Sequence, residues 1–115
     1  KLKKKTNKNT KIQLNIALNY GSKEEIINSV KKLNKLSLKI NEKNISKNLY
    51  TKNIPDPEIL IRTGNRFRLS NFLLWQSSYT EIFFIKKLWP DFNKSDFRKI
   101  VIKFKKMRRS FGGIK

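Results

Sequence analysis

The sequence contains no cysteine and no histidine among its 115 residues. Without cysteine, disulfides and thiolate metal sites are excluded, and without histidine the usual general base and the commonest metal ligand are missing. No uninterrupted apolar run approaches the roughly 20 residues of a membrane span. There is also no charged-then-apolar stretch typical of a secretion signal. These absences fit a cytosolic chain, so we expect a cytoplasmic location.

Acidic residues are scarce as well, with eight against 28 lysines and arginines, which gives a net charge of +20. A charge of this size attracts polyanions such as nucleic acid or anionic membranes. The excess is mostly lysine, however, and it is spread along the whole chain together with abundant asparagine. AT-rich genomes over-use both residues. We therefore interpret the general charge as compositional and consider the clustered arginines separately.

The first half of the sequence predicts a strand followed by two helices. Residues 1–10 form a polar leader, and alternating apolar residues then predict a strand with one buried face: Ile12, Leu14, Ile16 and Leu18. Ser22 is the expected N-cap of a helix, with Glu25 completing a capping box. Residues 44–50 are expected to form a short second helix.

The second half predicts two further strands and two further helices. Residues 59–61 are a short apolar run bounded by proline and glycine, as expected of a buried parallel strand. A helix is expected to start at Ser70, and a strand at residues 80–85. The last helix is expected to begin at Ser95 and to end at the glycines 112–113. Its predicted inner face consists of Phe97, Ile100, Val101 and Phe104.

Strands that alternate with helices indicate an α/β fold with a mostly parallel sheet flanked by helices. We expect about three strands and four helices, all within one domain at residues 11–115. Three strands make a small sheet with exposed edges. The chain is therefore expected to be part of a larger domain.

The stretch ILIRTGNRFRLSNFLLWQ (residues 59–76) contains three of the chain's six arginines. In open α/β sheets, ligands bind past the carboxyl ends of strands, which is where Arg62 falls. Arg68 and Ser70 precede the predicted helix, whose first N–H groups would be free to bind an anion. The planar guanidinium fork matches phosphate geometry. Arg62, Arg68 and Ser70 therefore predict a phosphate or diphosphate site. The alternative is that the arginines pair with nearby acids or remain solvated.

Glu81 stands between Tyr79 and the apolar run 82–85, where burying a lone carboxylate is costly. It either pairs with an arginine or helps to hold Mg²⁺ beside a diphosphate. A single carboxylate is weak evidence for a metal, so the spacing alone favours pairing.

Four segments together resemble the C-terminal half of a cis-prenyltransferase, most like the bacterial undecaprenyl diphosphate synthases. They are LNIALNYGSKEEI, PDPEILIRTGNRFRLSNFLLWQSSYTEIFF, LWPDF and RRSFGG, and the resemblance runs from about residue 9 to residue 113. It implies an enzyme that condenses isopentenyl diphosphate onto an allylic diphosphate with cis geometry, in the synthesis of polyprenyl lipid carriers. It also implies Mg²⁺, a homodimer, an apolar tunnel and a peripheral membrane contact at product release.

The resemblance assigns roles to individual residues. It implies that Arg62, Arg68 and Ser70 bind the diphosphate of isopentenyl diphosphate and that Glu81 is a Mg²⁺ carboxylate. Asn65 and Arg66 stand where the family usually has glycine and glutamate, and Ser110 stands where it has arginine, although Arg109 is adjacent.

Nothing in the sequence resembles the family's Asp-Gly-Asn-Gly-Arg loop, which carries the essential aspartate and belongs to the N-terminal half. We therefore expect no catalytic residue in this chain and no turnover by the chain alone. One alternative is a non-catalytic subunit of a heteromeric prenyltransferase, which the charge reversal at Arg66 favours. Another is a basic nucleic-acid-binding module. That alternative lacks any helix-turn-helix, zinc or RNP signature, so no specific nucleic acid is expected.

Overall fold

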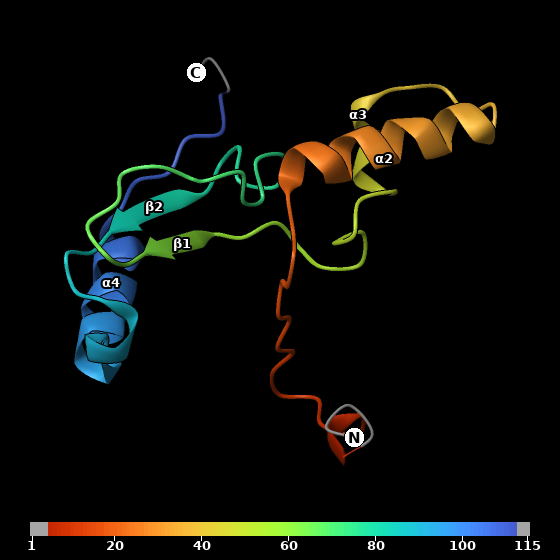
Figure 1. The fold of residues 1–115 in the computed structure, drawn as a ribbon. Helices are drawn as coiled ribbons and strands as arrows, with labels where there is room; N and C mark the ends of the chain where they lie inside the picture. The colour runs from red at the N-terminus through yellow and green to blue at the C-terminus, as the bar shows by residue number, and fades with distance from the viewer. Residues whose placement is uncertain (1–4, 113–115) are drawn as a thin grey trace.

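The structure is a computed structural model that describes residues 5–112. Figure 1 shows two neighbouring parts, one made of two helices and the other of a small sheet with a helix beside it. The elements in chain order are α2 (Ser22–Lys35), α3 (Glu42–Ser46), β1 (Ile59–Arg62), β2 (Glu81–Phe84), the 3-10 helix η1 (Trp89–Asp91) and α4 (Lys94–Lys106). The predicted α/β class is confirmed.

The sheet consists of β1 and β2, which run parallel in a register that pairs Ile59 with Glu81 and Arg62 with Phe84. Both strands were predicted, and the long connection 63–80 lets the chain return to start β2 beside β1. Phe83 of β2 and Ile100 of α4 are buried. Lys103 of α4 lies with its Nζ 5.8 Å from the ring centre of Phe83. Helix α4 therefore covers one face of the sheet.

The strand predicted in the first half does not form within the described residues. Residues 11–18 form no regular secondary structure and pair with no other strand there. Their four alternating apolar side chains are 72–84% exposed. The alternation places the apolar side chains on one face that is suited to burial. No part of residues 5–112 covers that face. The described part of the chain therefore has two strands rather than three.

Helix α2 begins as predicted, but its cap is different. Its N-cap is Gly21, which offers no side chain, and Ser22 instead uses its Oγ to accept a hydrogen bond from the N–H of Leu74 at 2.9 Å. The N–H of Ser22 donates to the carbonyl of Asn71 at 2.8 Å. Glu25 is fully buried and does not close a capping box. The predicted cap was wrong because its partners come from a segment some 50 residues further along the chain.

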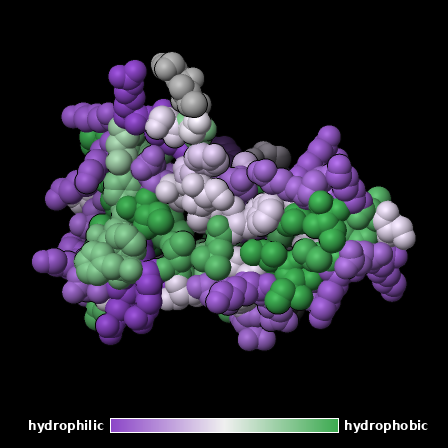
Figure 2. All heavy atoms as spheres, turned by 90° about the horizontal axis from the view of Figure 1, so that it is seen from above, coloured by the Kyte–Doolittle hydropathy of each residue, from purple (hydrophilic) through white to green (hydrophobic). Residues whose placement is uncertain are grey.

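Helix α3 starts two residues earlier than predicted and is shorter. Its N-cap is Asn41, whose side chain accepts a hydrogen bond from the N–H of Asn44 at 2.8 Å. The helix packs on α2 around a small core of Leu33, Ile45 and Leu49, flanked by Ile26, Val30 and Trp75. As seen from above in Figure 2, apolar side chains also reach the surface over both parts of the molecule.

The helix predicted to start at Ser70 is absent. Ser70, Asn71 and Leu73 all have left-handed backbones, with φ of 50°, 61° and 46°, and residues 70–79 form successive turns. Left-handed residues cannot continue a right-handed helix. Because Ser70 does not precede a helix, the helix-start part of the anion-site prediction is wrong.

Helix α4 is capped by Asn93, not by Ser95. The Asn93 side chain accepts from the N–H of Asp96, and the Asp96 carboxylate accepts from the N–H of Asn93, which completes a capping box. On the predicted inner face Ile100 is buried, but Phe97 is half exposed. The helix ends at Lys106, before the predicted glycines, of which Gly113 lies outside the described residues.

Candidate functional site

Three arginines lie at and just beyond the carboxyl end of β1. Arg62 is the last residue of the strand and is half-buried, whereas Arg66 and Arg68 are exposed in the following loop. Within residues 5–112, no hydrogen bond, ion pair or ring contact engages any of the three guanidinium groups. Three uncompensated cations within seven residues provide an electropositive edge that suits an anion.

Backbone hydrogen bonds fix the beginning of this loop. The N–H of Ile85 donates to the carbonyl of Arg62 at 2.8 Å, and the N–H groups of Gly64 and Asn65 donate to the carbonyls of Lys87 and Ile85 at 2.8 and 3.0 Å. Asn65 has a φ of 56°. Asparagine is one of the few side chains that tolerate this conformation. The asparagine can therefore stand where the resembling family usually has glycine.

Phe67 brings the middle of the loop back to the sheet. Its ring centre lies 5.1 Å from that of Phe84, the residue in register with Arg62. Arg66 and Arg68 flank Phe67, so this contact keeps them at the same edge of the sheet as Arg62. Sequence reasoning missed this role of Phe67. A lone aromatic between two arginines in a polar loop was the available signal.

Ser70 follows the arginine loop, which comprises residues 62–68. It lies in a turn that contacts the start of α2. Its side chain is exposed, and no hydrogen bond within the described residues joins it to Arg62 or Arg68. Its neighbour Asn71 is fixed by two contacts with α2, through its carbonyl to Ser22 and through its Oδ1 to the N–H of Lys23 at 2.8 Å. The structure thus fixes the backbone beside Ser70. Its binding role stays a prediction.

Glu81 lies at the other end of the sheet. It is in register with Ile59, three positions before the pair of Arg62 and Phe84, which corresponds to about 10 Å along a strand. The structure therefore groups the arginines where the two strands end, here called the carboxyl edge of the sheet. It places Glu81 where the strands begin, here called the amino edge. Arg109 lies beside Glu81, with its Nε 3.7 Å from Oε1.

Arg109 connects the C-terminal segment to this amino edge. Its Nη1 forms an ion pair with Glu58 at 3.1 Å, and its Nη2 donates to the carbonyl of Tyr79 at 3.0 Å. The guanidinium also lies 5.1 and 4.9 Å from the ring centres of Phe104 and Phe111. The sequence left two interpretations of Glu81, pairing with an arginine or binding Mg²⁺. The structure contains the pairing with an arginine.

The candidate metal ligand Glu81 has a second carboxylate near it, that of Glu58, and both interact with Arg109. Among residues 5–112, no group of three or more acidic, histidine or cysteine side chains could hold a metal ion. Mg²⁺ is often bound through one or two carboxylates together with substrate phosphates and water. A single carboxylate such as that of Glu81 fits that role.

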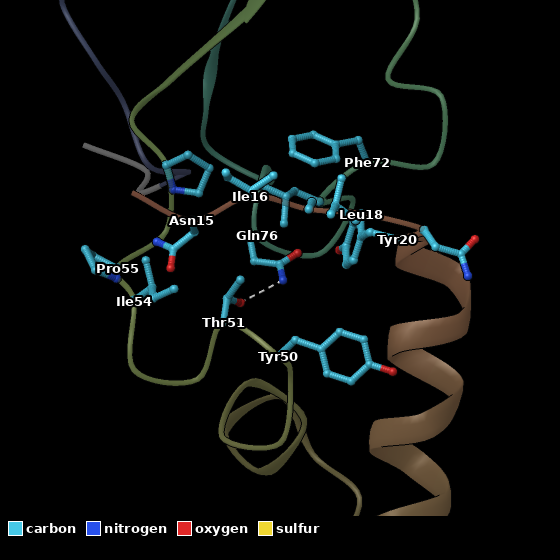
Figure 3. Close-up of a pocket in the computed structure, with 14 residues that line it drawn as sticks. Asn15, Ile16, Leu18, Tyr20, Tyr50, Thr51, Ile54, Pro55, Phe72 and Gln76 are labelled. Atoms are coloured by element: carbon cyan, nitrogen blue, oxygen red, sulfur yellow. Dashed lines mark hydrogen bonds between the residues drawn. The ribbon is translucent and has the colours of Figure 1, made fainter. Parts of the chain in front are cut away.

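An apolar cavity of about 450 Å³ lies away from the arginines, between residues 15–20, 50–57 and 72–76. Figure 3 shows Ile16, Leu18 and Phe72 on one side of it and Tyr50 on another, with Gln76 donating to Thr51 at 2.8 Å. Arg62, Arg68, Ser70 and Glu81 are not among the described residues that line it. This cavity is therefore separate from the predicted diphosphate site.

Glu25 joins three segments beneath this cavity. Its buried carboxylate accepts hydrogen bonds from the Tyr50 N–H at 2.7 Å, the Gln76 side chain at 3.2 Å and the Tyr20 hydroxyl. Burial and the hydrogen bond to Glu25 raise the pKa of Tyr20 above its usual value. Glu25 therefore fixes the segment that follows Asn71, and sequence reasoning had assigned it only to a cap.

Known proteins match almost the whole chain. A family model described as "Putative undecaprenyl diphosphate synthase" matches residues 1–112. The isoprenyl transferase of Heliobacterium mobile is 45% identical over 118 residues, which cover 96% of this chain and 45% of that protein. The "Ditrans,polycis-undecaprenyl-diphosphate synthase ((2E,6E)-farnesyl-diphosphate specific)" of Micrococcus luteus is 44% identical, and the match covers 97% of this chain and 48% of that protein.

A solved structure has the same fold. The "probable undecaprenyl diphosphate synthase" of Campylobacter jejuni superposes with a TM-score of 0.87 at 38% identity, covering 97% of this chain and 53% of that one. The fold and these matches place the chain in a family of prenyltransferases. The chain belongs to the undecaprenyl diphosphate synthase family of cis-prenyltransferases, of which it represents the C-terminal half. It spans about half the length of the relatives that it matches.

None of the helices within residues 5–112 is both long enough and apolar enough to cross a bilayer.

Proposed function

We propose that this chain provides the isopentenyl diphosphate grip of a cis-prenyltransferase that extends an allylic diphosphate with cis geometry. The observation that carries the proposal is the set of three unpaired guanidinium groups at the carboxyl edge of β1, where α/β folds bind their ligands. Arg62 and Arg68 would bind the diphosphate, and the Ser70 hydroxyl would donate to one of its oxygens. Arginine suits this task because its planar fork can bind two phosphate oxygens at once.

Glu81 is proposed to provide one Mg²⁺ ligand in the assembled enzyme. In this condensation the allylic diphosphate is the leaving group, and Mg²⁺ bound to it would neutralise part of its charge as it departs. Because Glu81 lies at the amino edge and the arginines at the carboxyl edge, one copy of this half does not bring them together. A second subunit could supply the missing neighbour, which fits the homodimer implied by the family. A cytoplasmic location and lipid-carrier synthesis are proposed on the family likeness alone.

The heteromeric alternative retains one supporting observation. Arg66 is exposed and unpaired among the described residues, and it replaces the acidic residue that the family usually has. Replacing the acidic residue by arginine adds a cation, which strengthens anion binding, and removes a carboxylate from the site. A non-catalytic subunit that binds a diphosphate would have these properties.

Calorimetric titration of the chain with isopentenyl diphosphate and with inorganic diphosphate tests the grip. We expect Arg62→Ala and Arg68→Ala each to weaken binding at least about tenfold, or about 1.4 kcal/mol, because each removes a charge-assisted contact. Arg98→Ala is the matched control, since Arg98 is exposed on α4 and its removal lowers the net charge equally. The proposal fails if the control loses as much affinity as the two loop variants, because binding would then follow net charge only.

A further inference from the structure

The turn that joins α2 to α3 exposes a small group of aliphatic side chains. Leu36, Leu38 and Ile40 are 53%, 47% and 49% exposed, and residues 36–40 are hereafter called the apolar tip. Single exposed apolar residues are normal on a protein surface, but three within five residues form a patch. In Figure 1 the turn begins at the end of α2 that is farther from the sheet and its arginines. The patch is therefore separate from the proposed diphosphate site.

Lysines surround the apolar tip on the adjoining parts of both helices. Residues 31–47 contain a single acidic residue, Glu42, and six lysines, all of them exposed: Lys31, Lys32, Lys35, Lys39, Lys43 and Lys47. Among the residues that the structure describes, none of these six lysines forms an ion pair. Figure 2 shows apolar side chains beside hydrophilic ones over the end of the molecule that α2 and α3 form. The surface thus combines an apolar centre with a cationic rim.

The backbone of the apolar tip is already hydrogen-bonded within the chain. The N–H groups of Leu36, Ser37 and Leu38 donate to carbonyls in the last turn of α2 at 3.0–3.2 Å. The carbonyl of Lys39 accepts from the Asn44 side chain at 2.7 Å. A turn with these backbone groups paired can enter a less polar environment without leaving them unsatisfied.

We propose that the apolar tip docks on a membrane surface that contains anionic phospholipids. Aliphatic side chains beside a cationic rim are the features by which peripheral segments bind the boundary between headgroups and acyl chains. The three aliphatic side chains enter that boundary, and the surrounding lysines interact with the negative headgroups. Lysine suits the rim because its apolar stem lies along the acyl region while its ammonium group stays in water.

Two other occupants fit the surface less well. A single-stranded nucleic acid would neutralise the lysines, but it binds by stacking its bases on aromatic side chains, and residues 31–47 contain no aromatic residue. A second copy of the chain would bring two lysine-rich surfaces together, and their like charges repel. An anionic lipid surface accommodates both the charge and the aliphatic side chains.

Cosedimentation with lipid vesicles tests the apolar part of the proposal. We expect the chain to bind phosphatidylcholine vesicles that contain phosphatidylglycerol at least about tenfold more tightly than pure phosphatidylcholine vesicles. Leu38→Ser with Ile40→Ser should weaken this binding at least about tenfold, because it removes inserted apolar area without changing the charge. Ile102→Ser with Met107→Ser is the matched control, since both residues are exposed and lie outside the tip.

A second pair of variants separates the position of the lysines from their number. Lys35→Gln with Lys39→Gln should weaken binding to the anionic vesicles about tenfold, because both lysines adjoin the tip. Lys99→Gln with Lys106→Gln lowers the net charge equally, but both residues are exposed on α4. This control should keep most of the affinity.

A fluorescent label tests insertion directly. Because the sequence contains no cysteine, Ile40→Cys creates a single labelling site in the tip. An environment-sensitive fluorophore attached there should shift its emission to the blue when anionic vesicles are added. The same fluorophore attached through Ile102→Cys should show no shift.

The proposal is overturned if the chain does not bind anionic vesicles, or if the label at position 40 stays in water when it binds. It is also overturned if either control pair loses as much affinity as its tip variant. RNA binding that requires Lys35 and Lys39, without vesicle binding, would identify a nucleic-acid surface instead. All measurements are made without diphosphates or Mg²⁺, so their outcome is independent of the proposed grip on isopentenyl diphosphate.

Discussion

At the scale of single residues, Glu25 shows how a buried carboxylate can be accommodated without a cation. It is fully buried, and its hydrogen-bond donors come from three segments, at Tyr20, Tyr50 and Gln76. Three donors replace the water that the carboxylate loses, which limits the cost of burying its charge. The same bonds connect α2 to the segment that follows the arginine loop.

Replacing Glu25 by alanine should destabilise the chain by about 3 kcal/mol, because three donors lose their acceptor in a buried site. Glu25→Gln should cost less, since an amide oxygen can still accept from the Tyr50 N–H. Urea unfolding measures both free energies. Glu24→Ala is the matched control, because Glu24 is adjacent to Glu25 in sequence but its carboxylate is exposed. Equal losses in Glu24→Ala and Glu25→Ala would contradict the role of the three hydrogen bonds.

Tyr20 makes the same site sensitive to alkaline pH. Burial is the larger cause and the hydrogen bond to Glu25 the next, and together they raise the pKa of Tyr20 above its ordinary value of 10.0. A raised folded-state pKa gives a stabilisation that is complete below about pH 10, the unfolded value, and is lost as the pH rises through the folded value. We expect part of the tyrosinate absorbance to appear late in a pH titration and to vanish in Tyr20→Phe. An unchanged titration curve in that variant would contradict the assignment.

At the scale of elements, the start of α2 depends on a residue that is distant in sequence. Asn71 accepts hydrogen bonds from two N–H groups of the first turn. Its carbonyl accepts from Ser22 and its Oδ1 from Lys23, at 2.8 Å each. A Cβ on Gly21 would lie 2.9 Å from the Asn71 Nδ2, so a larger residue there would push against the side chain that caps the helix. A helix start and the end of the arginine loop therefore stabilise each other.

Asn71→Ala should destabilise the chain by about 1–2 kcal/mol, because it removes the side-chain half of the cap and an asparagine from a left-handed position. It should also weaken diphosphate binding, since the backbone beside Ser70 loses an anchor. Asn41→Ala is the matched control. It removes the cap of α3, far along the sequence from the loop, and should lower stability by about 1 kcal/mol without changing diphosphate affinity. Calorimetry and thermal unfolding of both variants separate the two effects.

These elements show which parts of the fold the sequence can predict. The strands at 59–62 and 81–84 and the parallel sheet followed from short apolar runs and intervening helical patterns, which are local signals. The helix expected at Ser70 is absent because Asn71 and Leu74 bond to α2, a contact that no local pattern reveals. The segment 11–18 has the alternation of a strand, but it pairs with no strand within the described residues. Arginines at the strand end were predictable, whereas the roles of Phe67 and Arg109 depend on tertiary contacts.

At the scale of the whole molecule, the net charge of +20 opposes folding, because compaction brings lysines closer together. Raising the sodium chloride concentration shortens the screening length from about 10 Å at 0.1 M to about 3 Å at 1 M. The melting temperature should therefore rise with salt. Reversing the charge of two exposed lysines, Lys31→Glu and Lys52→Glu, changes the net charge by −2 at each position and should reduce this dependence. At matched ionic strength, diphosphate should stabilise the chain further than chloride, and Arg62→Ala should lose only that additional part. A melting temperature that is insensitive to chloride in both proteins would show that self-repulsion does not limit stability.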